Sequence, residues 1–90
     1  MDKVMEAGSF MDFGMFLQSI MLSAVAEGLS TCPQAALGEY PNIVREELGY
    51  ADNMIVMCGM ALGYEDSAAV VNSYRTPRED INSFTQFHLS

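Results

Sequence analysis

The pattern of apolar positions is strongest between residues 10 and 27, where it has the periodicity of a helix. Apolar side chains recur there at intervals of three and four positions, which places them on one helical face. That face comprises Phe13, Phe16, Leu17, Ile20, Met21 and Ala24, and Met11, Met15, Leu22 and Val25 widen it almost all the way round. A helix that is apolar on most sides is buried on most sides. Because 90 residues are too few to cover it, the pattern predicts a second subunit packed against this helix.

Capping and turn residues predict where this helix ends and which elements come after it. Ser9 is a suitable N-cap, with Asp12 three positions later. Gly28 occupies the position after a helix end that favours a left-handed backbone. Residues 30–33 then predict a loop, and residues 34–37 predict a single helical turn.

The middle of the chain predicts one short helix and one strand. Pro41 suits the first position of a helix over residues 42–48, which Gly49 ends. Residues 54–62 form a continuous apolar run, which is typical of a buried strand. A lone strand leaves its backbone groups unpaired, which is costly when they are buried. This strand is therefore expected to pair with a tail segment, another subunit or sequence absent from this chain.

The C-terminal third predicts a turn, an extended segment and a last short helix. The turn covers residues 63–66, and residues 68–74 are expected to be extended. Residues 76–79, Thr-Pro-Arg-Glu, combine a capping side chain with proline at the first helical position and glutamate at the third. This helix is expected to reach Phe84. The pattern contains no internal repeat or linker, so residues 1–90 are expected to form a single domain.

The formal net charge of −8 argues against a nucleic-acid or anionic membrane surface, since both require a basic patch. The most general role of so many acids is to keep the surface solvated. Residues 1–10 contain no apolar region typical of a signal peptide. Polar residues interrupt the apolar run of residues 10–25, which argues against a membrane span: Asp12, Gln18, Ser19 and Ser23. A cytoplasmic protein is expected.

No side chain stands out as a metal ligand, acid, base or nucleophile. Cys32 and Cys58 are too few for a disulfide framework and lack metal-site spacing, so both are expected to be reduced thiols. His88 is the single histidine and lies near the C-terminus, where a side chain is normally solvated. The absence of an obvious catalytic group suits a protein whose cofactor carries the chemistry.

Two segments have local chemistry of interest, and each also has a simpler explanation. Residues 31–36 place small side chains and exposed amides before a helical turn, where a flat ligand can approach closely, but a plain connection has the same pattern. Residues 72–78 contain Arg75 and Arg78, two of the four basic residues in the chain. Arginine matches phosphate oxygens, although surface arginines also bridge nearby acids.

Five segments in order resemble the C-terminal half of the nitroreductase family: residues 11–22, 28–36, 40–49, 58–64 and 71–78. The first resembles the family's long central helix and the second its flavin-facing loop. The remaining three resemble the next helix, the following strand and turn, and the closing tail. Each segment is loose alone, and their order and spacing make the resemblance specific.

The resemblance implies an α+β fold and an obligate homodimer with FMN at the subunit interface. It also implies electron transfer from NAD(P)H to nitroaromatic or quinone-like acceptors. The cofactor-binding residues by this resemblance are Pro33, Gln34, Ala35 and Ala36 against the isoalloxazine ring, and Ser73 and Arg75 at the phosphate end. The family's N-terminal half, with most of the central sheet and further phosphate contacts, has no counterpart here.

These observations leave three hypotheses open. The first is a half-length FMN-linked oxidoreductase of the nitroreductase type, with weak or absent flavin binding. The second is a truncated, flavin-free dimeric module with a structural or interaction role. The third is a subunit that complements a separately encoded N-terminal half. Bound FMN would colour the purified protein yellow, which separates the first two.

Overall fold

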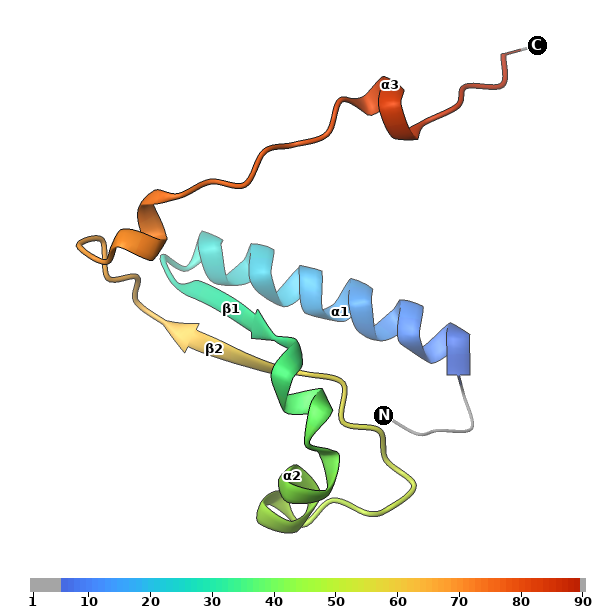
Figure 1. Ribbon diagram of the computed structural model, residues 1–90, viewed down its shortest axis with the longest axis vertical. Coiled ribbons are helices and arrows are strands. Elements are labelled where there is room, and N and C mark those ends of the chain that lie inside the picture. Colours follow the sequence, from blue (N-terminus) through green and yellow to red (C-terminus); the bar gives the residue numbers. More distant parts are fainter. Residues whose placement is uncertain (1–5, 90) are drawn as a thin grey trace.

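A computed structural model of the chain describes residues 6–89. Helices and two strands succeed one another along the chain in an α+β arrangement (Figure 1). In order, the elements are α1 (Glu6–Ala26), β1 (Ser30–Gln34), the 3₁₀ helix η2 (Ala35–Glu39), α2 (Pro41–Leu48), β2 (Gly59–Gly63), the 3₁₀ helix η3 (Val70–Ser73) and α3 (Ile81–Phe84). The expectation that residues 1–10 contain no signal peptide falls partly outside the described residues, because residues 1–5 are not among them.

The long helix α1 confirms the helical periodicity, but its start was predicted too late. It begins at Glu6, so Ser9 lies inside the first turns and is not the N-cap. Its end matches the prediction, because Gly28 has a φ of 78°. The amide of Leu29 donates to the carbonyl of Ala24 at 2.8 Å. This bond satisfies a carbonyl that the helix end would otherwise leave unpaired.

The two strands form an antiparallel pair that runs from Ser30 opposite Gly63 to Gln34 opposite Gly59. The predicted loop at residues 30–33 is therefore wrong. The strand predicted from the apolar run was expected to pair with a tail segment, another subunit or sequence absent from this chain. That prediction is also wrong, because the strand pairs with β1. Thr31 and Cys32 lie in an extended backbone whose groups pair with β2, and this pairing outweighs the loop character of the neighbouring proline.

The apolar run at residues 54–62 is only partly a strand. Regular pairing begins at Gly59, and residues 55–58 are half-buried without belonging to either strand. Those residues pass beneath η2 at very close range. A Cβ atom at Gly38 would lie 2.5 Å from the carbonyl oxygen of Met57, and one at Gly59 would overlap the side chain of Leu37. The bare backbone at these two glycines therefore allows η2 to pack directly on the segment before β2.

The short helix α2 confirms its prediction at both ends. Pro41 is its first residue, and Gly49 ends it with a φ of 72°. The single helical turn predicted at residues 34–37 is replaced by the longer η2, which continues from β1 without a break. The 3₁₀ helix η2, which directly follows β1, packs against both α2 and β2.

The C-terminal predictions fail at two places. Residues 70–73 form η3, although an extended segment was expected. No helix begins at Thr76; instead the carboxylate of Asp80 accepts the amide of Asn82 at 2.8 Å and caps α3. The side-chain and carbonyl oxygens of Thr76 both accept from Nη1 of Arg78, at 2.9 and 3.1 Å. The Thr76 hydroxyl therefore accepts from Arg78, and the predicted cap is not made. The predicted end of the helix at Phe84 is correct.

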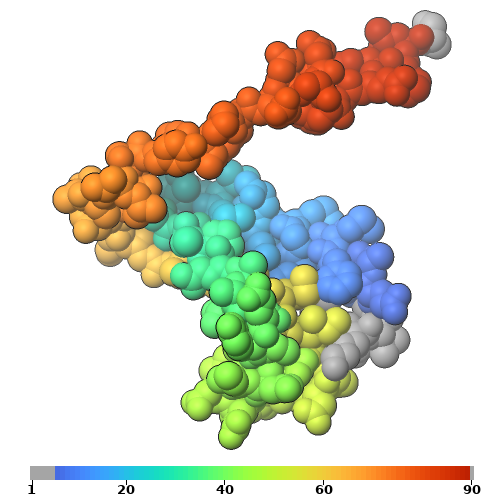
Figure 2. Space-filling view, in the orientation of Figure 1, coloured from blue at the N-terminus to red at the C-terminus, as the bar shows by residue number. Residues whose placement is uncertain are grey.

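The described chain is open. Its radius of gyration is 17.1 Å, against roughly 12 Å for a globular domain of this length. Residues 74–89 form an arm that extends away from the rest of the molecule (Figures 1 and 2). Within residues 6–89, Ala24 is the single buried hydrophobic residue. The chain alone therefore lacks a core of the size that stabilises a domain.

Helix α1 carries much of the exposed apolar surface. Its exposed large side chains are Phe10, Met11, Met15, Phe16, Leu22 and Val25. By length and composition the helix is also apolar enough to cross a membrane, despite the polar residues that argued against a span. Core helices of soluble proteins have the same length and composition. The exposure agrees with the prediction that α1 needs a further covering surface.

Candidate functional site

A wide cleft separates the start of the C-terminal arm from the body formed by α1, β1 and β2. Its volume is about 1070 Å³, just above the usual range for small-molecule sites. Met21, Leu22 and Val25 of α1 give it an apolar wall, and Thr31 and Cys32 of β1 add small polar groups. The cleft therefore combines apolar and polar surfaces, as a site for an amphiphilic organic ligand requires.

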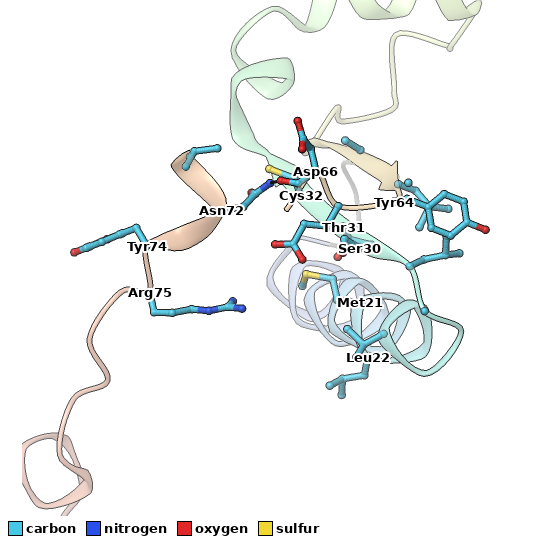
Figure 3. Close-up of a pocket in the computed structure, with 18 of the residues that line it drawn as sticks. Met21, Leu22, Ser30, Thr31, Cys32, Tyr64, Asp66, Asn72, Tyr74 and Arg75 are labelled. Atoms are coloured by element: carbon cyan, nitrogen blue, oxygen red, sulfur yellow. Dashed lines mark hydrogen bonds between the residues drawn. The ribbon is translucent and has the colours of Figure 1, made fainter. Parts of the chain in front are cut away.

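Arg75 enters this cleft from the arm. Its side chain is directed away from the arm and toward the α1 wall near Met21 (Figure 3). The structure gives Arg75 no hydrogen bond or ion pair with any residue between 6 and 89. Arg78 also borders the cleft, but its Nη1 group is already bound to Thr76. Of the two arginines, Arg75 is thus the one with all of its donors available to a ligand.

A turn centred on Asp66 determines where the arm leaves the body. The Asp66 carbonyl accepts the amide of Ala69 at 3.1 Å and the side-chain amide of Asn72 at 2.8 Å. Its carboxylate accepts the amide of Ala68 at 3.0 Å. These bonds fold residues 66–73 into a compact turn directly before Arg75. A single residue after β2 therefore orients the segment that carries the cleft arginine.

The structure separates the predicted site residues into two places. Arg75 lines the cleft, whereas Ser73 does not, and the Ser73 hydroxyl donates to the carbonyl of Val70 at 2.6 Å. The other four predicted residues lie beyond the cleft, at the end of β1 and the start of η2: Pro33, Gln34, Ala35 and Ala36. Strand β1 connects the two places, and from Thr31 to its end at Gln34 it spans roughly 10 Å at a strand's rise per residue.

Sequence reasoning missed the apolar wall of the cleft. Met21, Leu22 and Val25 were assigned to the buried stripe of the helix, since periodicity does not distinguish a wall of a ligand cleft from a core face. It also missed Asp66, which was assigned to a plain turn. An aspartate followed by small residues is a common signal for a side chain that bonds its own backbone, and that signal was present.

Known proteins match this chain along nearly all of its length. A model of the Nitroreductase family matches residues 2–64. The chain belongs to the nitroreductase family. It is 43% identical over 86 residues to a 4-nitrobenzoate reductase of Pseudomonas putida, covering 96% of this chain and 38% of that protein. It is 40% identical over 87 residues to a chloronitrobenzene nitroreductase of Comamonas testosteroni, covering 97% of this chain and 38% of that protein.

Solved structures show the same fold. The FMN and NADPH-dependent nitroreductase NfnB from sphigopyxis sp. strain HMH superimposes with a TM-score of 0.94 at 36% identity, covering 99% of this chain and 40% of that one. The FMN-dependent NfnB from Mycobacterium smegmatis, in complex with NADPH, gives 0.80 at 40% identity, covering 87% and 35%. These matches confirm the α+β nitroreductase fold. The chain spans about two-fifths of the length of these relatives.

Proposed function

We propose that this chain is the FMN-linked portion of a nitroreductase-type oxidoreductase, which transfers electrons from NAD(P)H to nitroaromatic or quinone-like acceptors. The observation that carries the proposal is Arg75, a cation with no described partner directed into a wide cleft beside β1. A cation with free donors in a cleft of this size suits a phosphorylated ligand.

FMN fits this arrangement because its phosphate and its ring lie at opposite ends of a ribityl chain. Arg75 would hold the phosphate, and β1 leads from that point to the four ring-facing residues of the proposal: Pro33, Gln34, Ala35 and Ala36. Ser73, whose hydroxyl donates to the carbonyl of Val70, would have to release that bond in order to donate to the phosphate. The separation along β1 favours an elongated ligand over a compact anion.

The side chains of this portion would bind and orient, without acting as acid, base or nucleophile. The chemistry that a bound FMN supplies is electron transfer between NAD(P)H and the acceptor. Small residues at positions 35 and 36 would let the ring approach the backbone closely. Met21 and Leu22 would exclude water from one side of the cleft, which strengthens the contact between Arg75 and a phosphate.

The proposed active form requires more surface than this chain provides. We infer a homodimer in which α1 is covered by a second subunit, because its exposed apolar side chains exceed what monomers normally present. A polypeptide corresponding to the N-terminal half of the family would supply further phosphate contacts. We also infer a cytoplasmic location, because the proposed reaction uses NAD(P)H as its electron donor. For the chain alone we expect FMN affinity in the micromolar range or weaker.

A flavin titration tests the proposal. Purified protein would be scanned at the flavin absorbance bands and then titrated with FMN while flavin fluorescence is followed. We expect weak saturable binding, an FMN affinity reduced about tenfold in Arg75→Ala and a smaller reduction in Arg78→Ala. Equal binding by Arg75→Ala and the parent would remove Arg75 from the site. Tight stoichiometric FMN in the purified protein would contradict the expected weakness.

A flavin-free dimeric module is the second candidate. The net charge of −8, together with the exposed apolar face of α1, favours it, since the acids repel an anionic ligand while the apolar face supports association. The expected observation for this candidate is a colourless dimer that gives no fluorescence change with FMN. Saturable binding that depends on Arg75 would exclude it.

A further inference from the structure

Arg45 holds the start of the loop that connects α2 to the segment before β2. It lies in the last turn of α2, and its carbonyl oxygen accepts the amide of Gly49 at 2.8 Å and that of Tyr50 at 3.1 Å. Gly49 has the left-handed backbone that reverses the chain at this point. The direction in which the loop leaves the helix is therefore tied to the backbone of Arg45.

The side chain of Arg45 holds the end of the same loop. Its Nε and Nη2 groups both donate to the carbonyl oxygen of Met54, at 3.1 and 3.0 Å. The side chain is half-buried, and its Nη1 group donates to Oδ1 of Asn42 at 3.0 Å. A charge-assisted bond away from bulk water is stronger than a surface contact. Arg45 therefore forms hydrogen bonds at both the start and the end of this loop.

The loop between these two attachments has little buried surface of its own. Residues 50–53 are all exposed, and the amide of Met54 donates to the carbonyl of Ala51 at 3.1 Å within the loop itself. Segments with few buried contacts open at low free energy. The contact between Arg45 and Met54 accordingly restrains where the chain enters the half-buried segment, residues 55–58.

That half-buried segment supports the residues proposed to face the flavin. Met57 passes directly beneath Gly38 of η2, with no room for a Cβ atom between them. Just beyond, Gly59 pairs with Gln34 and Met60 pairs with Pro33 across the two strands. The position of residues 55–60 therefore determines the position of residues 33–36.

We propose that Arg45 is a positioning residue for the flavin-facing segment, residues 33–36, which it orients through Met54 and the segment beneath η2. The inference rests on the proposed function for its flavin readout, while the positioning itself is measurable without flavin. A lysine at this position keeps the charge but offers a single ammonium in place of the two donors that Arg45 directs at one carbonyl oxygen. Arg45→Lys is therefore the informative variant.

Amide hydrogen exchange by NMR tests the positioning in the full chain. We expect Arg45→Lys to accelerate exchange about tenfold at residues 34–38 and 56–60, because the supporting segment opens more often. Amides in the middle of α1 should keep their rates. Asn42→Ala is the matched control, since it removes the third contact of Arg45 and leaves both bonds to Met54 in place. Its rates should match the parent's.

Two exchange results would overturn the proposal. Unchanged rates at residues 34–38 in Arg45→Lys would show that the segment does not depend on Arg45. Equal acceleration across α1 would show a general loss of stability and no local positioning. Either result is readable whether or not the protein binds flavin.

A flavin measurement distinguishes failure of this proposal from failure of the proposed function. Parent and Arg45→Lys would be titrated with FMN while visible-region circular dichroism of the bound flavin is recorded. We expect a changed ring signal with a dissociation constant within about threefold of the parent's, because the phosphate contact at Arg75 is untouched. Identical ring signals in both proteins would overturn the inference. If the parent binds no FMN, the proposed function fails and hydrogen exchange alone decides the role of Arg45.

Discussion

Gly38 and Met57 approach so closely that a Cβ atom at position 38 would lie 2.5 Å from the Met57 carbonyl oxygen. The carbonyl oxygen of Val56 would lie 3.1 Å from that Cβ atom. Both obstacles are backbone atoms, which cannot move aside as the end of a flexible side chain can. The contact between η2 and the segment before β2 therefore depends on a glycine at this position.

Gly38→Ala is predicted to destabilise the protein by about 1–3 kcal/mol, the usual cost of forcing an extra methyl group into a packed contact. For a chain of this length the melting temperature should fall by roughly 5 °C or more. Gly14→Ala is the matched control, because a Cβ at this position of α1 meets nothing within 4 Å. Alanine there should stabilise the helix by up to about 1 kcal/mol. Calorimetry on both variants checks the opposite signs, and equal shifts would contradict the close contact.

The predictability of the fold depends on the range of the interactions involved. Helices α1 and α2 were predictable because spacing and end residues such as Pro41 and Gly49 act within a few positions. Strand β1 was not, since residues 30–34 become extended only by pairing with residues 59–63, far away in the sequence. At the C-terminal helix, both Thr76 and Asp80 offered a capping side chain, and the structure uses Asp80.

The left-handed backbone at Gly49 gives a second prediction. With a φ of 72°, this position costs most residues about 1–2 kcal/mol, whereas asparagine adopts it more readily. Gly49→Ala should therefore lower the melting temperature more than Gly49→Asn does. Thermal unfolding monitored by circular dichroism measures the difference. Equal melting temperatures for the two variants would mean that the loop relaxes out of the left-handed conformation.

Association through α1 gives a third prediction. Phe16 was expected to lie in the core, yet within the chain it is 60% exposed and lines a small apolar groove with Ile20 and Leu62. Any large effect of removing it in the isolated chain must therefore come from contacts with another copy of the chain. We expect the parent to be a dimer by light scattering and Phe16→Ala to be largely dissociated or aggregated, since burying such a side chain contributes about 1.5–3 kcal/mol.

Leu48 provides the control for that measurement. It is also 60% exposed, but it lies on α2, away from the groove. Leu48→Ala should leave the mass of the assembly unchanged. A parent that is monomeric at micromolar concentration would contradict the proposed homodimer directly. A Phe16→Ala variant with the parent's mass and melting temperature would show that this face of α1 remains exposed.

The candidate site was predictable only as far as one residue. Arg75 and Arg78 both stood out because basic residues are scarce in this acidic chain; the family resemblance selected Arg75, which is the one predicted site residue that lines the cleft. Residues 33–36 entered through family resemblance, and their relation to Arg75 depends on the direction of β1. Met21 and Leu22 form a wall of the cleft only because the turn after β2 places Arg75 opposite α1, which tertiary structure decides (Figure 3).

The last prediction separates the phosphate contact of Arg75 from every other contribution to flavin binding. Riboflavin has the ring and ribityl chain of FMN but lacks the phosphate, so the ratio of the two affinities reports the phosphate contact alone. A charge-assisted hydrogen bond contributes about 1.5–3 kcal/mol, and the exposure of Arg75 favours the lower end, so the parent should bind FMN about tenfold more tightly than riboflavin. Arg75→Ala should bring the FMN affinity down to that of riboflavin and leave riboflavin unchanged. Arg75→Lys should keep part of the preference for FMN over riboflavin, because the lysine ammonium keeps the positive charge but lacks the paired N–H donors of a guanidinium. Raising the salt concentration should weaken FMN binding and spare riboflavin. If Arg75→Ala lowers both affinities equally, Arg75 orders the arm without contacting the phosphate, and the orientation of the flavin along β1 would have to be reversed or abandoned.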